Sequence, residues 1–209
     1  IKIFNWLATL WRGTLVMKTP LYFSLGFLST FVIGGISGVI LAIFPVDWQL
    51  HDTYFVIAHF HYTLVGGAIF SIFAGIYYWF PKMTGRLLSE KLGIASFVVM
   101  FIGFNVTFGI QHAIGLEGMP RRIYEYADIH GLGWMNLVST IGSFVFGLGI
   151  LLTIINVARS LKQGRRSCSR TSIPKPACAA SYSSSRFGPM SQSTSAEPAN
   201  GKLGIPLIA

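Results

Sequence analysis

The amino-acid sequence predicts an all-α fold, a polytopic bundle of one partial and four full transmembrane helices followed by a disordered tail. Hydrophobic residues make up 52% of the 209 residues and charged residues only 11%. Four stretches contain no Asp, Glu, Lys or Arg, and each is longer than the ~20 residues that cross a bilayer core. These stretches are residues 19–46, 53–81, 92–116 and 129–158.

The first two elements are a partial helix and a glycine-containing span. Residues 1–11 are apolar except for Lys2 and Asn5, and they are too few to cross a bilayer. Lys2 has two interpretations: it either reaches the membrane surface or faces a polar cavity. The second span, predicted at residues 21–44, carries a Gly-x-x-x-Gly pair at Gly34 and Gly38, which indicates close contact with another helix.

The remaining spans are predicted at residues 53–80, 92–115 and 129–158, with aromatic residues before Pro81 that suit a membrane interface. His112 lies in the stretch 92–116 without a partner at ligand spacing, so we interpret it as structural. Pro45 and Pro81 are expected to end the spans that precede them.

The carboxyl-terminal segment differs in composition. Residues 163–209 are rich in Ser and Pro without an apolar period, which predicts disorder. We therefore divide the chain into a membrane domain, residues 1–162, and a low-complexity basic tail, residues 163–209. Eight Lys or Arg against Glu197 give residues 159–209 a net charge of +7, out of +9 for the whole chain. The basic pI therefore gives no indication of nucleic-acid binding.

Loop charges predict the orientation of the spans. The segments 12–18 and 82–91 are rich in Lys and Arg, whereas 45–52 has none, so the basic segments are expected on the cytoplasmic or matrix side. The segment 117–128 breaks this rule, because it places Arg121 and Arg122 on the outer side. Either nearby acids, Glu117, Glu125 and Asp128, balance these arginines, or the arginines bind an anionic ligand through their planar, bidentate groups.

Three of the five histidines lie within the stretch 51–62. His59 and His61 fall inside an uncharged span, where titratable groups are costly and usually functional. At positions i and i+2 of a helix they point about 200° apart, so they suit two different cofactors, with Phe60 between them. His51 and Asp52 precede the span, where Asp52 either caps the helix or, with His51, binds a divalent cation.

These motifs resemble a known family. His51-Asp52-Thr53-Tyr54 and His59-Phe60-His61-Tyr62 resemble the signature of the haem-copper oxidases, subunit I of cytochrome c oxidase. The resemblance implies that His59 is the axial ligand of the high-spin haem and that His61 is one of two axial ligands of the low-spin haem. It also implies that His51 and Asp52 are ligands of a magnesium or manganese ion shared with subunit II.

The resemblance extends to two further motifs. Ile-Lys-Ile-Phe-Asn-Trp at the start of the chain resembles the helix whose lysine conducts protons, which implies that role for Lys2. Met119-Pro120-Arg121-Arg122 resembles the motif that binds the haem propionates. The tail does not align with the family's carboxyl ends.

The resemblance implies a carboxyl-terminal fragment of a terminal respiratory oxidase. Such an enzyme transfers electrons from cytochrome c to oxygen, reduces it to water and pumps protons, using two a-type haems and copper. The copper ligands and the second low-spin haem ligand belong to earlier helices, so the fragment alone is expected to be inactive. The implied partners are subunits II and III, cytochrome c and membrane lipid, in a bacterial plasma membrane or a mitochondrial inner membrane.

Two other functions stay open. A quinol-oxidising subunit I of the same superfamily shares the His-x-His pattern and the double arginine but usually has Asn in place of Asp52. A non-redox membrane transporter, of a different class, could use the paired histidines as a proton relay.

Overall fold

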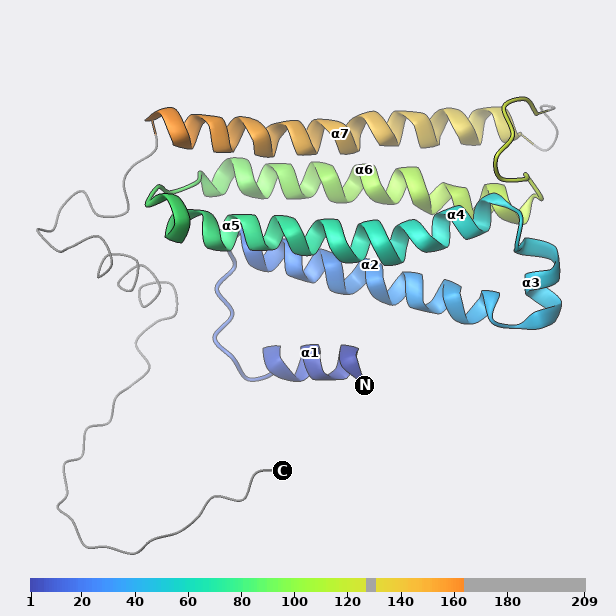
Figure 1. Ribbon diagram of the computed structural model, residues 1–209, viewed down its shortest axis with the longest axis horizontal. Helices are drawn as coiled ribbons and strands as arrows, with labels where there is room; N and C mark the ends of the chain where they lie inside the picture. Colours follow the sequence, from blue (N-terminus) through green and yellow to red (C-terminus); the bar gives the residue numbers. More distant parts are fainter. Residues whose placement is uncertain (127–130, 164–209) are drawn as a thin grey trace, which may run out of the picture.

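The computed structural model describes residues 1–126 and 131–163, and every regular element in them is helical (Figure 1). Four of the helical segments are long and apolar enough to cross a membrane, which confirms the predicted class. These are α2 (Thr19–Leu41), the continuous segment Tyr54–Thr84, α6 (Glu90–Leu116) and α7 (Leu132–Gln163). The predicted disordered tail lies outside the described residues, apart from Gln163.

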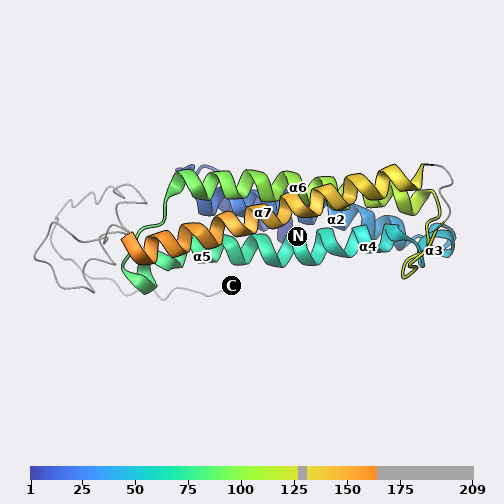
Figure 2. The same ribbon diagram turned by 90° about the horizontal axis from the view of Figure 1, so that it is seen from above.

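The helices run along one long axis and stack as successive layers. In Figure 1, α7 packs on α6, and α6 packs on the Tyr54–Thr84 segment, which in turn packs on α2. The short helix α1 (Lys2–Leu10) lies beyond α2 and contacts it through Trp6, whose ring lies 5.0 Å from that of Phe27. Figure 2 shows the same near-parallel arrangement from above.

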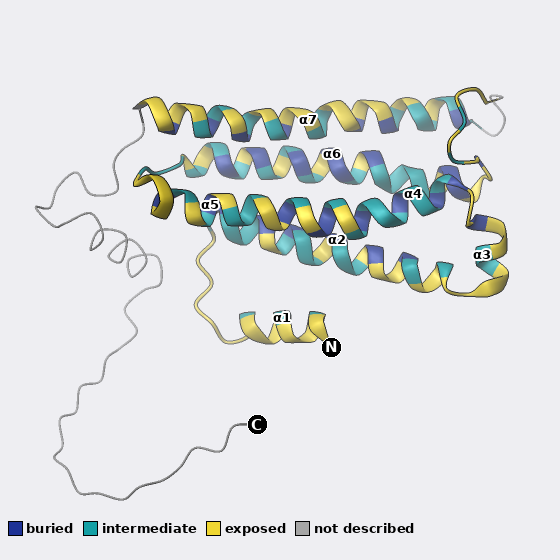
Figure 3. Cartoon of the chain, in the orientation of Figure 1, coloured by how far each residue is buried: buried dark blue, intermediate teal, exposed yellow. Residues whose placement is uncertain are grey.

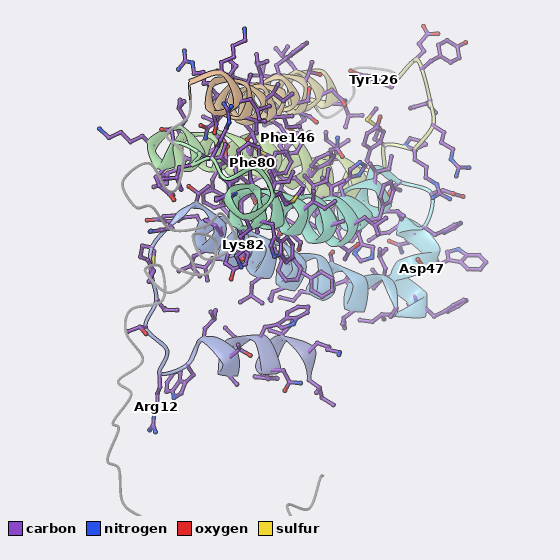
Figure 4. The ribbon with its side chains drawn as sticks, turned by 60° about the vertical axis from the view of Figure 1, so that its left-hand side comes forward. Arg12, Asp47, Phe80, Lys82, Tyr126 and Phe146 are labelled. Carbon is purple, nitrogen blue, oxygen red and sulfur yellow. The ribbon has the colours of Figure 1, made fainter. Side chains whose placement is uncertain are left out.

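Connections between helices alternate between the two ends of the bundle. The short helix α3 (Phe44–Leu50) and the segment 117–126 lie at one end, and the segments 11–18 and 85–89 lie at the other (Figure 1). Figure 4 likewise shows Asp47 and Tyr126 on one side, away from Arg12. This alternation is the one expected from the charge pattern.

Both proline-based boundaries predicted above were wrong. Helix α2 ends at Leu41, and Pro45 instead lies in the first turn of α3, where its missing N–H is not needed. Pro81 lies inside α5 (Phe70–Thr84), and the helix ends where Gly85 adopts a φ of 66°. Glycine accepts that left-handed conformation without a Cβ penalty, so it marks the helix end.

The histidine-bearing span is not a uniform α-helix. It begins as α4 (Tyr54–Phe60), becomes a π-helix, η1 (His61–Ile69), and continues as α5. Segments of π-helix are uncommon and frequently occur at functional sites. A Cβ built on Gly66 in this segment would lie 2.7 Å from the Thr30 hydroxyl oxygen, so η1 approaches α2 closely.

Aromatic side chains dominate the centre of the bundle. Phe23, Phe70 and Phe104 are fully buried, and Phe23 lies between rings from α5 and α6. Figure 3 shows buried positions facing the neighbouring helices, while exposed positions line the outer surface. An outward apolar surface is what a membrane helix presents to lipid. On α7 it includes Trp134, Leu137, Ile141, Phe144, Leu148, Leu151 and Ile154.

A polar cluster joins α5, α6 and α7 near the end that carries residues 85–89. Asn156, only 1% exposed, donates to the Ser89 carbonyl at 3.0 Å and accepts from the Ser89 N–H at 3.1 Å. Ser96 and Thr153 hydrogen-bond each other at 2.8 Å, beside the Tyr77 hydroxyl. Buried polar groups of this kind are stable because each finds a partner.

Candidate functional site

His59 lies on α4 and is held by α2. Its Nδ1 lies 2.9 Å from the Ser37 hydroxyl oxygen and 3.0 Å from the Gly34 carbonyl oxygen. The ring also lies against Gly38, where a Cβ would come within 2.8 Å of His59 Cε1. The Gly-x-x-x-Gly pair predicted to mark a close helix contact therefore faces the histidine helix.

His61, the first residue of η1, turns towards α6. Its Nδ1 lies 2.7 Å from the carbonyl oxygen of Ile57, one turn earlier. The ring stacks on Phe108 of α6 at 4.1 Å between centroids with an interplanar angle of 14°, and Phe60 lies 4.5 Å from its centre. His59 and His61 therefore occupy one continuous helical segment and contact different neighbouring helices, as their spacing predicts.

The two imidazoles share one hydrogen-bonding pattern. A carbonyl oxygen can only accept, so a carbonyl next to Nδ1 requires that nitrogen to carry the proton. The lone pair of each ring then resides on Nε2, the atom that is free to bind a metal. A metal-bound histidine almost always donates its other N–H to such a partner, so both residues fit axial ligands of two separate centres.

His51 and Asp52 lie together just before α4. His51 Nε2 is 3.3 Å from Asp52 Oδ2, and the two side chains are 56% and 67% exposed. Helix α4 is capped by Thr53, whose hydroxyl accepts the Phe55 N–H at 3.3 Å, so capping does not require Asp52. No group of three or more His, Cys, Asp or Glu side chains gathers at metal-binding distance among the described residues.

Arg121 binds Asp52 rather than an acid of its own loop. Its Nε and Nη2 lie 3.0 and 2.8 Å from Asp52 Oδ1, and its backbone N–H donates to the Asp52 carbonyl at 2.8 Å. An isolated antiparallel bridge between Thr53 and Pro120, with Tyr54 N–H donating to Met119, extends the contact. The arginine loop is therefore attached to the start of the histidine helix.

Arg122 does not share the ion pair of Arg121 with Asp52. It is exposed and has a φ of 65°, the left-handed conformation that reverses the chain after Arg121. Within residues 1–126 and 131–163 no ion pair joins it to a carboxylate, including Glu117 and Glu125. The third acid considered as a local partner, Asp128, lies outside the described residues.

The other two residues considered from the sequence lie apart from this site. Lys2 is exposed on α1, and its side chain makes no hydrogen bond or ion pair in the described part of the chain. His112 on α6 lies against the rings of Phe55 and Tyr62, at 5.0 and 5.3 Å. Its Nε2 is buried without a hydrogen-bond partner among the described residues.

Sequence reasoning missed Ser37 and Phe108, which contact the two histidines from other helices. Ser37 had a weak signal, because it is a polar residue beside the glycine pair in an uncharged span. Phe108 had none, because the chain is rich in phenylalanine and only the packing selects this one.

The protein has four apolar spans, and two imidazoles diverge from one of them. These features place it in the class of multi-pass membrane helix bundles with paired histidines in their interior. The chain belongs to the family described as Cytochrome C and Quinol oxidase polypeptide I, that is, subunit I of the haem-copper oxidases, whose sequence model matches residues 1–145.

Relatives with curated descriptions support this assignment. The chain is 52% identical over 166 residues to cytochrome c oxidase subunit 1 of Alkalihalophilus pseudofirmus, covering 79% of this chain and 27% of that protein. It is 50% identical over 157 residues to cytochrome c oxidase subunit 1 of Bacillus subtilis, covering 75% and 25%. The chain therefore spans about a quarter of the length of these relatives.

A solved structure of a heme-copper terminal oxidase dimer has a similar fold. The TM-score is 0.60 at 21% sequence identity, over 68% of this chain and 26% of that chain. At this identity the likeness concerns the fold alone.

Proposed function

We propose that residues 1–162 form the carboxyl-terminal part of subunit I of a cytochrome c oxidase and supply one axial histidine to each of two haems. One observation carries the proposal: His59 and His61 each have Nδ1 beside a carbonyl and turn towards different helices, α2 and α6. Each therefore offers an Nε2 lone pair to a separate iron.

The roles of this chain's residues follow from that arrangement. Bound haem iron supplies the redox chemistry by which electrons reach oxygen and water is formed. The protein fixes the orientation of His59 through α2 and of His61 through Ile57 and Phe108. Family membership implies haems and copper. We propose that the haems are of the a type. The copper ligands and the second low-spin ligand lie outside this chain, so the fragment alone does not catalyse the reaction.

Arg121 and Arg122 are assigned to the haem propionates. Arg121 already uses Nε and Nη2 at one oxygen of Asp52, and a guanidinium has five N–H donors, so donors remain for a second anion. Arg122 has no carboxylate partner within the described residues, which leaves its planar group available. Two arginines beside the start of the histidine helix suit a pair of carboxylates.

His51 and Asp52 are assigned to a magnesium or manganese ion. His51 Nε2 and Asp52 Oδ2 are 3.3 Å apart, while the other carboxylate oxygen contacts Arg121. One imidazole and one carboxylate are too few ligands for such an ion, so subunit II is proposed to supply others. Lys2 is proposed as the entry of a proton path. Subunits II and III, cytochrome c and lipid are the proposed partners.

Oxidation of quinol instead of cytochrome c is the second candidate, because the family description covers both kinds of enzyme. The relatives named above are cytochrome c oxidases, and Asp52 stands where quinol oxidases usually have Asn, which favours cytochrome c. Steady-state assays of the assembled oxidase with reduced cytochrome c and with a quinol distinguish the two donors. Turnover with quinol alone would overturn the choice of cytochrome c.

Haem ligation is tested by single substitutions in the assembled oxidase that contains this segment. We expect His61→Asn to remove the low-spin haem band from reduced-minus-oxidised spectra and to retain carbon monoxide binding. We expect His59→Asn to abolish carbon monoxide binding at the high-spin haem. His112→Asn is the control and should preserve both signals. Retention of both haem signals in the His59 and His61 variants would contradict haem ligation by these histidines. It would instead leave the proton-relay transporter as the alternative role for the pair.

A further inference from the structure

One turn of α2 contacts the His59 ring through three residues. Gly34, Ser37 and Gly38 are spaced i, i+3 and i+4, so they share one face of the helix, and that face meets α4. Gly34 offers its carbonyl, Ser37 its hydroxyl and Gly38 the space that a Cβ would fill. Ser37 is 5% exposed, so water has little access to its hydroxyl.

The three polar atoms form a closed set of hydrogen bonds. The Ser37 hydroxyl donates to the Gly34 carbonyl at 2.9 Å, so its proton is already committed. The same oxygen lies 2.9 Å from His59 Nδ1, where it can act only as an acceptor. The Nδ1–H of His59 therefore has two acceptors, the hydroxyl of Ser37 and the carbonyl of Gly34 at 3.0 Å.

Two acceptors have two consequences for the ring. They fix its rotation, because the N–H must point between two oxygens from a single helical turn. They also draw the Nδ1 proton away from the ring, which makes Nε2 a more basic metal ligand. The Gly34 carbonyl alone would fix the ring less firmly and would raise the basicity of Nε2 less.

We propose that Ser37 is a positioning residue for the high-spin haem: its hydroxyl, acting through His59 Nδ1, strengthens the bond between His59 Nε2 and the iron. This inference rests on the proposed ligation by His59. It assigns a role in tuning the site to a side chain on a neighbouring helix that does not itself touch the haem.

The test is the iron–histidine stretching frequency of the reduced high-spin haem, measured by resonance Raman spectroscopy on the assembled oxidase. We expect Ser37→Ala to lower this frequency and to raise the midpoint potential of the same haem, because a less basic ligand stabilises the oxidised iron less. Ser37→Thr keeps the hydroxyl and should restore both values. Ser37→Cys, a weaker acceptor of similar shape, should give an intermediate shift.

Ser29→Ala is the matched control. Ser29 lies on the same helix and donates to the carbonyl three residues earlier, Gly26, at the same 2.9 Å, and within the described residues no histidine is hydrogen-bonded to it. We expect no shift in this variant. An unchanged frequency in Ser37→Ala, or an equal shift in Ser29→Ala, would overturn the role of Ser37. A band that persists in His59→Asn would instead overturn the ligation on which the inference rests.

Discussion

The guanidinium of Arg121 contacts Asp52 Oδ1 through two nitrogens, at 3.0 and 2.8 Å, although 69 residues separate the two in the chain. The backbone N–H of Arg121 donates to the carbonyl of the same aspartate at 2.8 Å. Side chain and backbone together therefore attach the arginine loop to the residue that precedes the histidine helix. A change at Asp52 is expected to affect both the proposed cation site and the proposed propionate site.

The first prediction concerns the charge at Arg121. In the assembled oxidase, Arg121→Gln should lower the haem midpoint potential, because a less compensated propionate favours the oxidised iron. Arg121→Lys should lower it less, since the charge remains but the planar fork is lost. Redox titration measures both effects. Arg12→Gln, an exposed change at the other end of the bundle, is the control, and equal potentials in all variants would remove the propionate assignment.

The second prediction concerns the cation site at Asp52. Asp52→Asn should reduce the magnesium or manganese content of the purified oxidase, because a neutral amide is a weaker ligand for a hard cation than a carboxylate. Its direct effect on stability should be small, since exposed ion pairs contribute about 0–1 kcal/mol. Elemental analysis and manganese EPR measure occupancy. Glu117→Gln is the control, and full occupancy in Asp52→Asn would remove Asp52 from the ligand set.

The third prediction concerns the contact between α6 and α7. A Cβ at Gly103 would lie 2.7 Å from Phe146 Cα, and backbone cannot move aside as a flexible side chain can. Gly103→Ala should therefore destabilise the bundle by about 1–3 kcal/mol, the range for overpacking. Gly147→Ala is the matched control, because its Cβ would meet no atom of the described residues within 4 Å. Denaturation in mixed micelles measures both, and equal stability would show that α6 and α7 are not so closely packed.

The fourth prediction concerns the polar cluster around Asn156. Asn156→Leu leaves the N–H and the carbonyl of Ser89 without their side-chain partner, which should cost about 1–3 kcal/mol. Thr140→Val is the control, because Thr140 is exposed and, among the described residues, its hydroxyl bonds only the Asn136 carbonyl of its own helix. Thermal inactivation of the assembled oxidase compares the two. A melting temperature unchanged by Asn156→Leu would mean that water or another group replaces the amide.

The sequence alone determined the number of spans, because the length of an apolar stretch can be counted locally. A stretch longer than the ~20 residues needed to cross a bilayer core predicts one membrane helix. It also determined that His59 and His61 diverge, since the spacing along a helix fixes their directions. The helix ends were harder to predict. Pro45 and Pro81 were both expected to end a helix, yet Pro45 lies in the first turn of α3 and Pro81 lies inside α5. Proline lacks an N–H and its ring crowds the carbonyl of the preceding turn, so its effect depends on its position in the helix and on the surrounding packing.

The tertiary structure decided which side chains meet across helices. Local charge pattern offered Glu117, Glu125 and Asp128 as partners of the arginines, but packing of the loop against α4 gave Arg121 the distant Asp52. Packing likewise selected Ser37 as the hydroxyl beside His59. Such contacts depend on the register and rotation of neighbouring helices, which are set by the summed fit of many small contacts, and no single motif encodes them.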